Sequence, residues 1–248
     1  KGQHKKNILT NGNMNFNTIF RQGSNAETSF AHQETLIANF ESIPKEREFD
    51  MTAGRNPENR TKNRFKNILP YDFNRVILNT TYGNQSDYIN ASYISTSRKA
   101  NEFIACQGPK PETLADFWKM IWDNHVTVVV MLANLVETGK KKCEQYWPDV
   151  ERQQQYGDVT TETTMEQFLP SYTHRVIKVW KGEQSRSVSH YHFRVWPDHG
   201  APKTAMALLN FRNKTKNEMS SSEAPVVVHC RQCWGWENWN IHSLGLAP

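Results

Sequence analysis

Residues 111–133 read PETLADFWKMIWDNHVTVVVMLA. Four apolar residues of the first half recur at helical spacing, namely Leu114, Phe117, Trp118 and Ile121. This period predicts a helix over Pro111–Asp123 with one apolar face. The second half, Val126–Ala133, is a nearly continuous apolar run, which is typical of a strand buried on both faces of a sheet. A helix that leads directly into a buried strand favours an α/β domain.

Predicted helices and strands also alternate on both sides of this stretch. Short apolar runs separated by Asn, Gly and Asp predict strands and turns from Arg64 to Ile94. Further strands are expected at Arg175–Trp180, His190–Val195 and Val226–His229. Helices are expected at Thr28–Ile43 and at Thr204–Lys216, with Thr204 as a candidate N-cap. Together these elements predict an α/β domain whose central mixed sheet is flanked by helices.

The composition excludes several classes of protein. With 37% hydrophobic and 22% charged residues among 248, we expect a sizeable core and no wholesale disorder. The net charge of +5 is mild, and no cluster of Lys and Arg is dense enough to predict a nucleic-acid partner. The longest apolar run, Val126–Ala133, is far too short to span a bilayer. Because the sequence begins at Lys1 and not at Met, we expect it to be a fragment.

One of the four cysteines stands at a position that suits a reactive thiol. Cys106, Cys143, Cys230 and Cys233 are too few and too scattered for a disulfide framework, so a reducing compartment is expected. Cys230 ends an apolar strand, and open α/β sheets bind ligands at the carboxyl ends of strands. A helix beginning just beyond it would favour the thiolate and bind anions. The alternative is an inert buried cysteine, which this local sequence alone favours.

Three other stretches hold candidate functional residues, each with a structural alternative. In HFRVWPDHGAP, Asp198 lies between Pro and a His-Gly turn, where it is either a general acid or a turn-forming residue. In TKNRFKNILPYD, Phe65 stands among basic residues, which suits an aromatic phosphoester but also a strand with a solvated basic face. In LVETGKKKCEQYWPD, Glu137 precedes a glycine and a lysine run, and composition alone favours an ordinary charged surface loop.

A family resemblance changes the weight of these alternatives. The segments KNRFKNILPYD, SDYINASYI, EFIACQGPKPETLADFWKMIWDNHVTVVVML, KKCEQYWPD, FRVWPDHGAP and VVVHC occur in the order found in classical protein tyrosine phosphatases. From about Phe30 to Cys230, the chain most resembles the catalytic domains of receptor-type members. The resemblance implies a highly twisted mixed sheet flanked by helices, and hydrolysis of phosphotyrosine in proteins. It also implies no metal or organic cofactor.

The resemblance assigns a role to each matching residue. Cys230 matches the nucleophile, whose thiolate forms a phosphocysteine, and Asp198 matches the general acid that protonates the tyrosine leaving group. Phe65 matches the aromatic residue that stacks on the phosphotyrosine ring, a position more often occupied by Tyr. Asn67 matches the residue that holds the substrate backbone.

Three further matches are supporting residues. Glu137 matches the acid that orients the phosphate-binding arginine, and Lys142 matches the lysine that reaches the general-acid loop. His229, directly before the nucleophile, is a supporting residue as well. The implied partners are phosphotyrosine proteins, with a membrane contact only through a segment outside this sequence. The implied location is cytoplasmic, as in the intracellular part of a single-pass receptor.

The sequence departs from the family pattern directly after Cys230. The family loop reads His-Cys-x5-Arg, and its amides and arginine hold the phosphoryl group. Here Trp236 stands at the arginine position, and Arg231 is adjacent to the cysteine, where it cannot take that place. The later glutamine-bearing loop and the closing helices of the family are also absent from these 248 residues. The chain as written is therefore expected to be catalytically impaired and C-terminally truncated.

The genetic code suggests how this departure arose. Tryptophan has the single codon TGG, so a reading frame shifted by one base turns Trp234, Trp236 and Trp239 into glycines. From Gln232 onward, the shifted frame permits Ser-Ala-Gly-Val-Gly-Arg-Thr-Gly-Thr-Phe, which is the missing family loop. The three bases of Arg231 and one of Gln232 separate the Cys230 codon from this Ser codon. A four-base misplacement thus predicts that the tail is out-of-frame translation.

These inferences divide the sequence into three parts. Residues 1–27 are interpreted as an N-terminal arm or juxtamembrane linker, 28–230 as a truncated phosphatase domain and 231–248 as the aberrant tail. One alternative is a non-catalytic scaffold that binds phosphotyrosine, and another is a product that cannot fold. A redox or metal pair at Cys230-x-x-Cys233 is disfavoured, because no second ligand pair stands at a suitable spacing.

Overall fold

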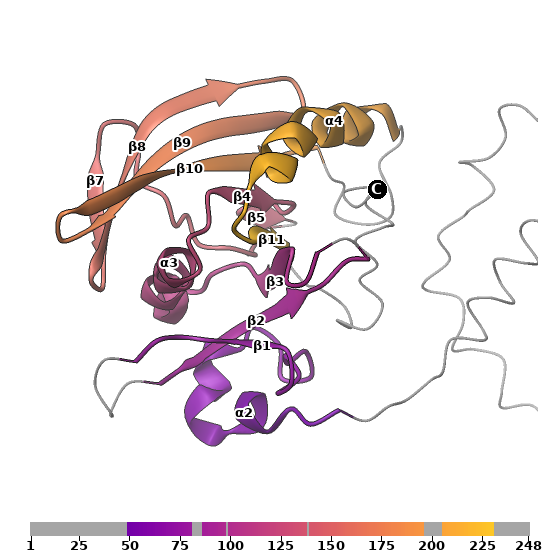
Figure 1. Cartoon of the computed structure of the whole chain (residues 1–248), viewed down its shortest axis with the longest axis vertical. Helices are drawn as coiled ribbons and strands as arrows, with labels where there is room; N and C mark the ends of the chain where they lie inside the picture. Colours follow the sequence, from indigo (N-terminus) through magenta and orange to yellow (C-terminus); the bar gives the residue numbers. More distant parts are fainter. Residues whose placement is uncertain (1–48, 81–85, 98, 138, 196–204, 231–248) are drawn as a thin grey trace, which may run out of the picture. The chain divides into compact units, whose positions relative to one another are not determined.

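A nine-stranded mixed sheet organises the residues that the computed structural model describes, which are 49–80, 86–97, 99–137, 139–195 and 205–230. Its strand order is β1-β2-β3-β11-β4-β10-β9-β8-β7 (Figure 1). The strands of this sheet are β1 (Arg75–Ile77), β2 (Tyr88–Ile94), β3 (Phe103–Gln107), β4 (Val128–Met131), β7 (Gln153–Tyr156), β8 (Val159–Phe168), β9 (Tyr172–Lys181), β10 (Gln184–Phe193) and β11 (Val226–Cys230).

Shorter elements surround the sheet. A separate two-stranded hairpin pairs β5 (Val136–Glu137) with β6 (Lys140–Lys141). The helical elements are α2 (Thr52–Arg55), η2 (Pro57–Lys62), η3 (Pro111–Thr113), α3 (Leu114–Asp123) and α4 (Ala205–Ser221). No helix in the described part of the chain has the length and apolar character needed to cross a membrane.

The centre of the sheet is parallel and its outer strands are antiparallel. Strand β11 lies between β3 and β4 and is parallel to both, and β4 is also parallel to β10. The remaining pairs are antiparallel. Parallel neighbours require crossover connections, and α3 links β3 to β4 while α4 links β10 to β11. The structure thus confirms the predicted α/β class with a central mixed sheet.

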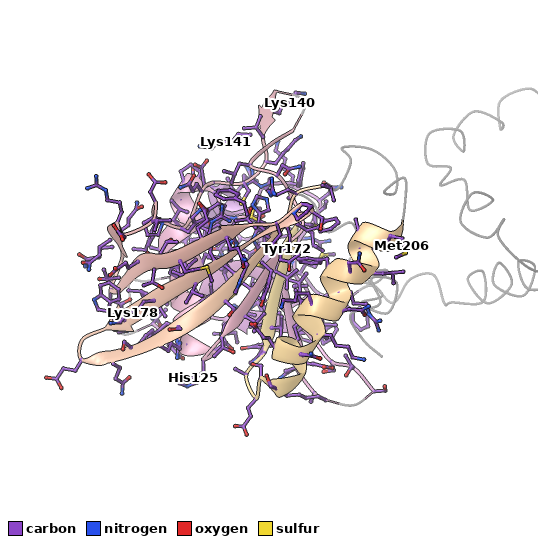
Figure 2. The ribbon with its side chains drawn as sticks, turned by 90° about the horizontal axis from the view of Figure 1, so that it is seen from above. His125, Lys140, Lys141, Tyr172, Lys178 and Met206 are labelled. Atoms are coloured by element: carbon purple, nitrogen blue, oxygen red, sulfur yellow. The ribbon has the colours of Figure 1, made fainter. Side chains whose placement is uncertain are left out.

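The two faces of the sheet pack against different helices (Figure 1). On the α3 face, Phe117 and Trp118 of the helix are almost completely buried against strand residues such as Val129 and Val227. On the α4 face, Phe211 packs against Tyr172, with ring centroids 5.2 Å apart. Figure 2 shows Tyr172 between the sheet and α4. Alternate residues of each strand supply the two faces, because successive side chains point to opposite sides.

Most predicted elements are found, with different boundaries. The helix expected over 111–123 forms as η3 followed by α3, and the strand expected over 126–133 forms over Val128–Met131. The helix expected to end at 216 continues to Ser221, because Met219 in its last turn is also buried against the sheet. Strand β10 ends at Phe193, two residues earlier than expected. The predicted helix at 28–43 and the N-cap Thr204 lie outside the described residues.

Candidate active site

Cys230 is the last residue of β11, at the carboxyl end of the parallel part of the sheet. Its carbonyl accepts a hydrogen bond of 3.0 Å from the amide of Gly108, and the carbonyl of His229 accepts one of 2.9 Å from the amide of Leu132. These bonds fix the end of β11 between the residues that follow β3 and β4. The half-buried Cys230 side chain packs with Tyr71 and Ala105. The prediction that the cysteine ends a central strand is confirmed.

His229 points to the opposite face and is completely buried. The hydroxyl of Tyr146 lies 2.7 Å from Nε2 of His229 and 2.7 Å from Nε2 of His190. A tyrosine hydroxyl carries one proton, so it donates to one imidazole and accepts from the other. Trp118 supports this arrangement by donating from Nε1 to the carbonyl of Tyr146 at 2.7 Å. The residue before the candidate nucleophile is therefore tied to both α3 and β10.

Burial keeps the imidazoles of this cluster neutral. Desolvation, with a smaller contribution from His192, lowers the pKa of His229 to about 3. Desolvation also lowers the pKa of His190 well below its usual value, and Arg175 lowers it further. Both groups are uncharged at neutral pH, as the shared hydroxyl of Tyr146 requires. The cluster holds the end of β11 in place by hydrogen bonding and packing, with no charge of its own.

The segment after β3 brings a second predicted element to this end of the sheet. The guanidinium of Arg64 donates to the carbonyls of Gly108 and Pro109, each at 2.9 Å. Its amide donates to Oε1 of Gln107 at 2.9 Å. These bonds anchor the turn that carries Phe65 and Asn67 next to the segment that binds Cys230. Phe65 is half-buried in this turn and Asn67 is exposed, so the strand alternative for Phe65 is wrong.

The hairpin of β5 and β6 reaches the same segment. Glu137 pairs with Lys140 across a turn at Gly139, whose φ is 73°. After the hairpin, the amide of Glu144 donates to the carbonyl of Pro109 at 3.0 Å. Cys143, the second residue after the hairpin, lies against Gly108. A Cβ atom at Gly108 would be 3.0 Å from Sγ of Cys143, so only glycine lets the two segments approach this closely.

Lys142 follows β6 directly, and its amide donates to the carbonyl of Leu135 at 2.8 Å. Its side chain is half-buried. The neighbouring Lys140 and Lys141 are exposed, and Figure 2 shows them at the outer end of the hairpin. Glu137 and Lys140 therefore lie opposite each other on the two strands of a hairpin, across the turn at Gly139.

The structure joins some of the predicted residues and leaves others undescribed. It brings His229, Cys230 and the Phe65 turn to one end of the sheet through the segment Gln107–Pro109. Asp198 and all residues after Cys230 lie outside the described residues. Sequence reasoning missed Tyr146, His190 and Gly108, although each lies within or beside a motif that carries the family resemblance.

Nothing in the described ranges forms a metal site. No group of three or more His, Cys, Asp or Glu side chains there is arranged to hold a metal ion. Cys233, which would be the partner of Cys230 in a metal or redox pair, lies outside those ranges.

Comparison with known proteins adds to this geometry. The family model of protein-tyrosine phosphatases matches residues 59–235. Receptor-type tyrosine-protein phosphatase eta of Mus musculus is 45% identical over 177 residues, which cover 70% of this chain and 14% of that protein. Receptor-type tyrosine-protein phosphatase C of Homo sapiens is 38% identical over 201 residues, 79% of this chain and 15% of that protein. The chain therefore spans well under a quarter of the length of these curated relatives.

Proposed function

The chain belongs to the protein-tyrosine phosphatase family, and from this premise we propose that its domain hydrolyses phosphotyrosine in proteins through a phosphocysteine. The observation that carries the proposal is the placement of Cys230 at the carboxyl end of a central parallel strand. Ligands of α/β sheets bind at that edge. The turn bearing Phe65 and Asn67 is anchored at the same edge through Arg64 and Gly108.

Each predicted site residue then has a distinct task. The Cys230 thiolate attacks phosphorus while Asp198 protonates the departing tyrosine oxygen, and water later hydrolyses the phosphocysteine. Phe65 stacks on the substrate ring and Asn67 holds the substrate backbone. The selectivity for phosphotyrosine over phosphoserine follows from depth, because the longer aromatic side chain reaches a nucleophile that phosphoserine cannot.

The supporting residues act on this machinery. Glu137 orients the arginine of the phosphate loop, and Lys142 reaches the segment that carries Asp198. His229 fixes the end of β11 through the hydroxyl of Tyr146. We further propose phosphotyrosine proteins as partners and a location on the cytoplasmic side, as for the intracellular part of a receptor. The domain limits of 28–230, with an arm at 1–27 and an aberrant tail at 231–248, are part of the same proposal.

This chain itself should turn over little substrate. The position of the phosphate-binding arginine holds Trp236, and most of the small residues expected in the phosphate loop are replaced. A single donor in such a site contributes about 100-fold or more to the rate. The direct test is an assay of the purified chain on a phosphotyrosine peptide, with Cys230→Ser as the inactive control. Turnover well above that control would contradict the proposed impairment.

Restoring the reading frame tests the cause of the impairment. A coding sequence without the four bases after the Cys230 codon, continued through its downstream exons, would place an arginine six residues after the cysteine. That arginine would give Glu137 a partner, and Asp198 would then have a leaving group to protonate. We expect phosphatase activity, and we expect Asp198→Ala to lower kcat more than substrate affinity. A repaired protein that folds and cannot hydrolyse phosphotyrosine would reject the frameshift explanation.

A second candidate function is a scaffold that binds phosphotyrosine without hydrolysis. The observation that favours it is the combination of Trp236 at the arginine position with an intact anchor for the Phe65 turn. Binding of a phosphotyrosine peptide by the chain as written, weakened by Phe65→Ala but not by Cys230→Ser, would support this function. The absence of any measurable binding would exclude it.

A further inference from the structure

On the α3 face, the apolar core gives way to polar residues near the end of β10. The register of β9 and β10 pairs Arg175 with His190 and Thr173 with His192, and the amide of Arg194 donates to the carbonyl of Ser171. Directly paired residues share a face of the sheet. Further along the same two strands, that face is apolar, with Ile177, Val179 and Val188. Thr173, Arg175, His192 and Arg194 therefore form one polar cluster, named here the β9–β10 cluster.

The cluster holds two cations, and a carboxylate pairs with Arg175. The guanidinium of Arg175 lies over the ring of Trp147, 4.4 Å from its centroid, and Nε donates to Glu166 at 2.5 Å. Arg194 donates from Nη2 to the carbonyl of Leu169 at 2.6 Å. Both arginine side chains are thus fixed through part of their hydrogen-bonding capacity, and the cluster keeps an excess of positive charge.

One polar atom on each of the four residues remains without a partner. Among the described residues, Oγ1 of Thr173, Nη1 of Arg175, Nε of Arg194 and Nδ1 of His192 are buried and make no hydrogen bond. Nδ1 of His190, which pairs with Arg175 on the same face, is buried and without a partner as well. Thr173 is 0% exposed, and Arg175 and His192 are each 6% exposed. An unpaired polar atom is costly in such surroundings. Four of them on adjacent positions of one ladder indicate a ligand that they share.

The protonation of His192 defines what that ligand must offer. Its Nε2 lies 2.9 Å from the carbonyl of Ala133, which can only accept, so Nε2 carries the proton. Burial, aided by Arg175, lowers the pKa of His192 to about 4, so the ring is neutral at pH 7 and Nδ1 is an acceptor. The four residues therefore present three donors, on Thr173, Arg175 and Arg194, and one acceptor. Nδ1 of neighbouring His190 donates or accepts according to the tautomer that the hydroxyl of Tyr146 selects.

From this arrangement we propose that the β9–β10 cluster binds inorganic phosphate. Hydrogen phosphate offers three oxygen acceptors and one P–OH donor, which match the three donors and the acceptor on His192. Sulfate has the same size and charge but no proton to donate at neutral pH, so it would face Nδ1 with an oxygen lone pair. Because Thr173 is completely buried, the site suits a free ion and not a phosphorylated side chain of a protein. This inference does not depend on the proposed phosphatase activity.

The test is a titration of the full chain with phosphate and with sulfate at constant ionic strength, followed by calorimetry and by amide chemical shifts in β9 and β10. We expect phosphate to bind at least about tenfold more tightly than sulfate, because phosphate makes one more hydrogen bond, and one hydrogen bond to a charged group changes affinity by about that factor. A phosphotyrosine peptide, which would occupy the candidate active site, should not compete with phosphate for the cluster. If the peptide displaced phosphate, or if sulfate bound equally well, the assignment to the β9–β10 cluster would be wrong.

Two variants of the cluster sharpen the test. Thr173→Val removes one donor, and Arg194→Lys keeps the charge while removing Nε–H, so each should weaken phosphate binding about tenfold. Without phosphate, Thr173→Val should melt no lower than the parent, because the lost hydroxyl has no partner there.

The matched control is Thr163→Val, since that buried hydroxyl donates to the carbonyl of Pro148 at 2.7 Å. It should lower the melting temperature and leave phosphate binding intact. Unaltered affinity in both cluster variants would overturn the proposal. Competition by a phosphoserine peptide would overturn the choice of a free ion.

Discussion

The two faces of the central sheet are closed to different degrees. On the α3 face, Trp118 and Ile121 of the covering helix are completely buried. On the α4 face, Phe211 is completely buried, but Met206 and Leu209 of the same helix are 60% and 44% exposed. Figure 2 shows Met206 at one end of α4. The helix on the first face therefore buries its large apolar residues, and we call this face closed. The helix on the second face still presents apolar side chains to solvent, and we call this face open.

This difference bears directly on the candidate active site. Because successive strand residues point to opposite faces, His229 belongs to the α3 face and Cys230 to the α4 face. The closed face supplies the rigid support of β11, through Tyr146 and Phe117. The open face receives the candidate nucleophile.

The largest expected effect comes from a cavity in the closed face. Trp118→Ala should lower the free energy of unfolding by about 4–5 kcal/mol, and Phe211→Ala by about 3 kcal/mol. The indole is enclosed by other aromatic rings and donates to the carbonyl of Tyr146, so its cavity cannot collapse. The cavity left by Phe211 can shrink, because α4 borders solvent. Urea denaturation of both variants measures the difference, and an equal or larger loss for Phe211→Ala would refute the unequal closure of the faces.

The second prediction concerns acid. Burial lowers the pKa of His229 to about 3 and of His192 to about 4, and it lowers that of His190 well below its usual value. In the unfolded chain these groups take up protons near pH 6.5, so the unfolded state binds more protons below that pH. Stability is therefore complete above pH 6.5 and decreases as the pH falls. We expect a loss of about 1 kcal/mol per histidine between pH 6.5 and 5.5.

Denaturation curves measured across this range test the histidine assignment. His192→Gln keeps a donor for the carbonyl of Ala133 and cannot titrate, so it should remove about a third of the loss. Half-buried His174, on the α4 face, has a pKa lowered for the same reason and adds a smaller share. If His174→Gln flattened the pH dependence more than His192→Gln, the closed face would not be its source.

A third, smaller effect isolates the hydroxyl that the two histidines share. Tyr146→Phe should cost about 1–3 kcal/mol, because Nε2 of His190 and Nε2 of His229 both lose their partner in a buried site. Tyr156→Phe is the matched control, since its buried hydroxyl has no hydrogen-bond partner within the described residues. That variant should be neutral or slightly more stable. Equal costs in thermal melts would show that hydrogen bonding is not what fixes His229.

The closed face is also the part of the fold that the sequence predicts best. The 3.6-residue period of α3 and the apolar run of β4 are both visible in residues 111–133. Strand β8, on the same sheet, was missed because polar residues occupy its buried positions. Thr161 and Thr163 are 0% and 1% exposed, and their hydroxyls are satisfied by main-chain carbonyls of Gln154 and Pro148. Alternation of hydrophobicity cannot reveal a strand whose interior is hydrogen-bonded.

The candidate site also has features that the sequence predicts and features that it does not. The position of Cys230 at a strand end follows from local sequence, and its proposed role follows from motifs that resemble a family. The contact between Tyr146 and His229 joins residues 83 positions apart, so no local pattern predicts it. No local pattern predicts the contacts of Gly108 either. They are the close approach of Cys143 and the hydrogen bond from the amide of Gly108 to the carbonyl of Cys230, and both partners are distant in the sequence. The structure therefore adds the long-range contacts of these residues, which the sequence motifs do not reveal.

The smallest effect on stability is expected on the open face. Met206 and Leu209 lie three positions apart on α4, so they share one exposed face of the helix. Met206→Gln with Leu209→Gln keeps good helix formers and should change the free energy of unfolding by no more than about 0.5 kcal/mol. The same pair should reduce self-association, because exposed apolar patches promote it.

Light scattering against protein concentration provides the measurement. Ile77→Gln is the control, since Ile77 is 57% exposed but lies on β1 at the far edge of the sheet. If the α4 face is the one left open, the double variant stays monomeric at concentrations where the parent and Ile77→Gln associate. An equal improvement from Ile77→Gln would mean that exposed apolar residues contribute wherever they stand. In that case the asymmetry between the faces would have no consequence for solubility, and it would bear only on the surroundings of Cys230.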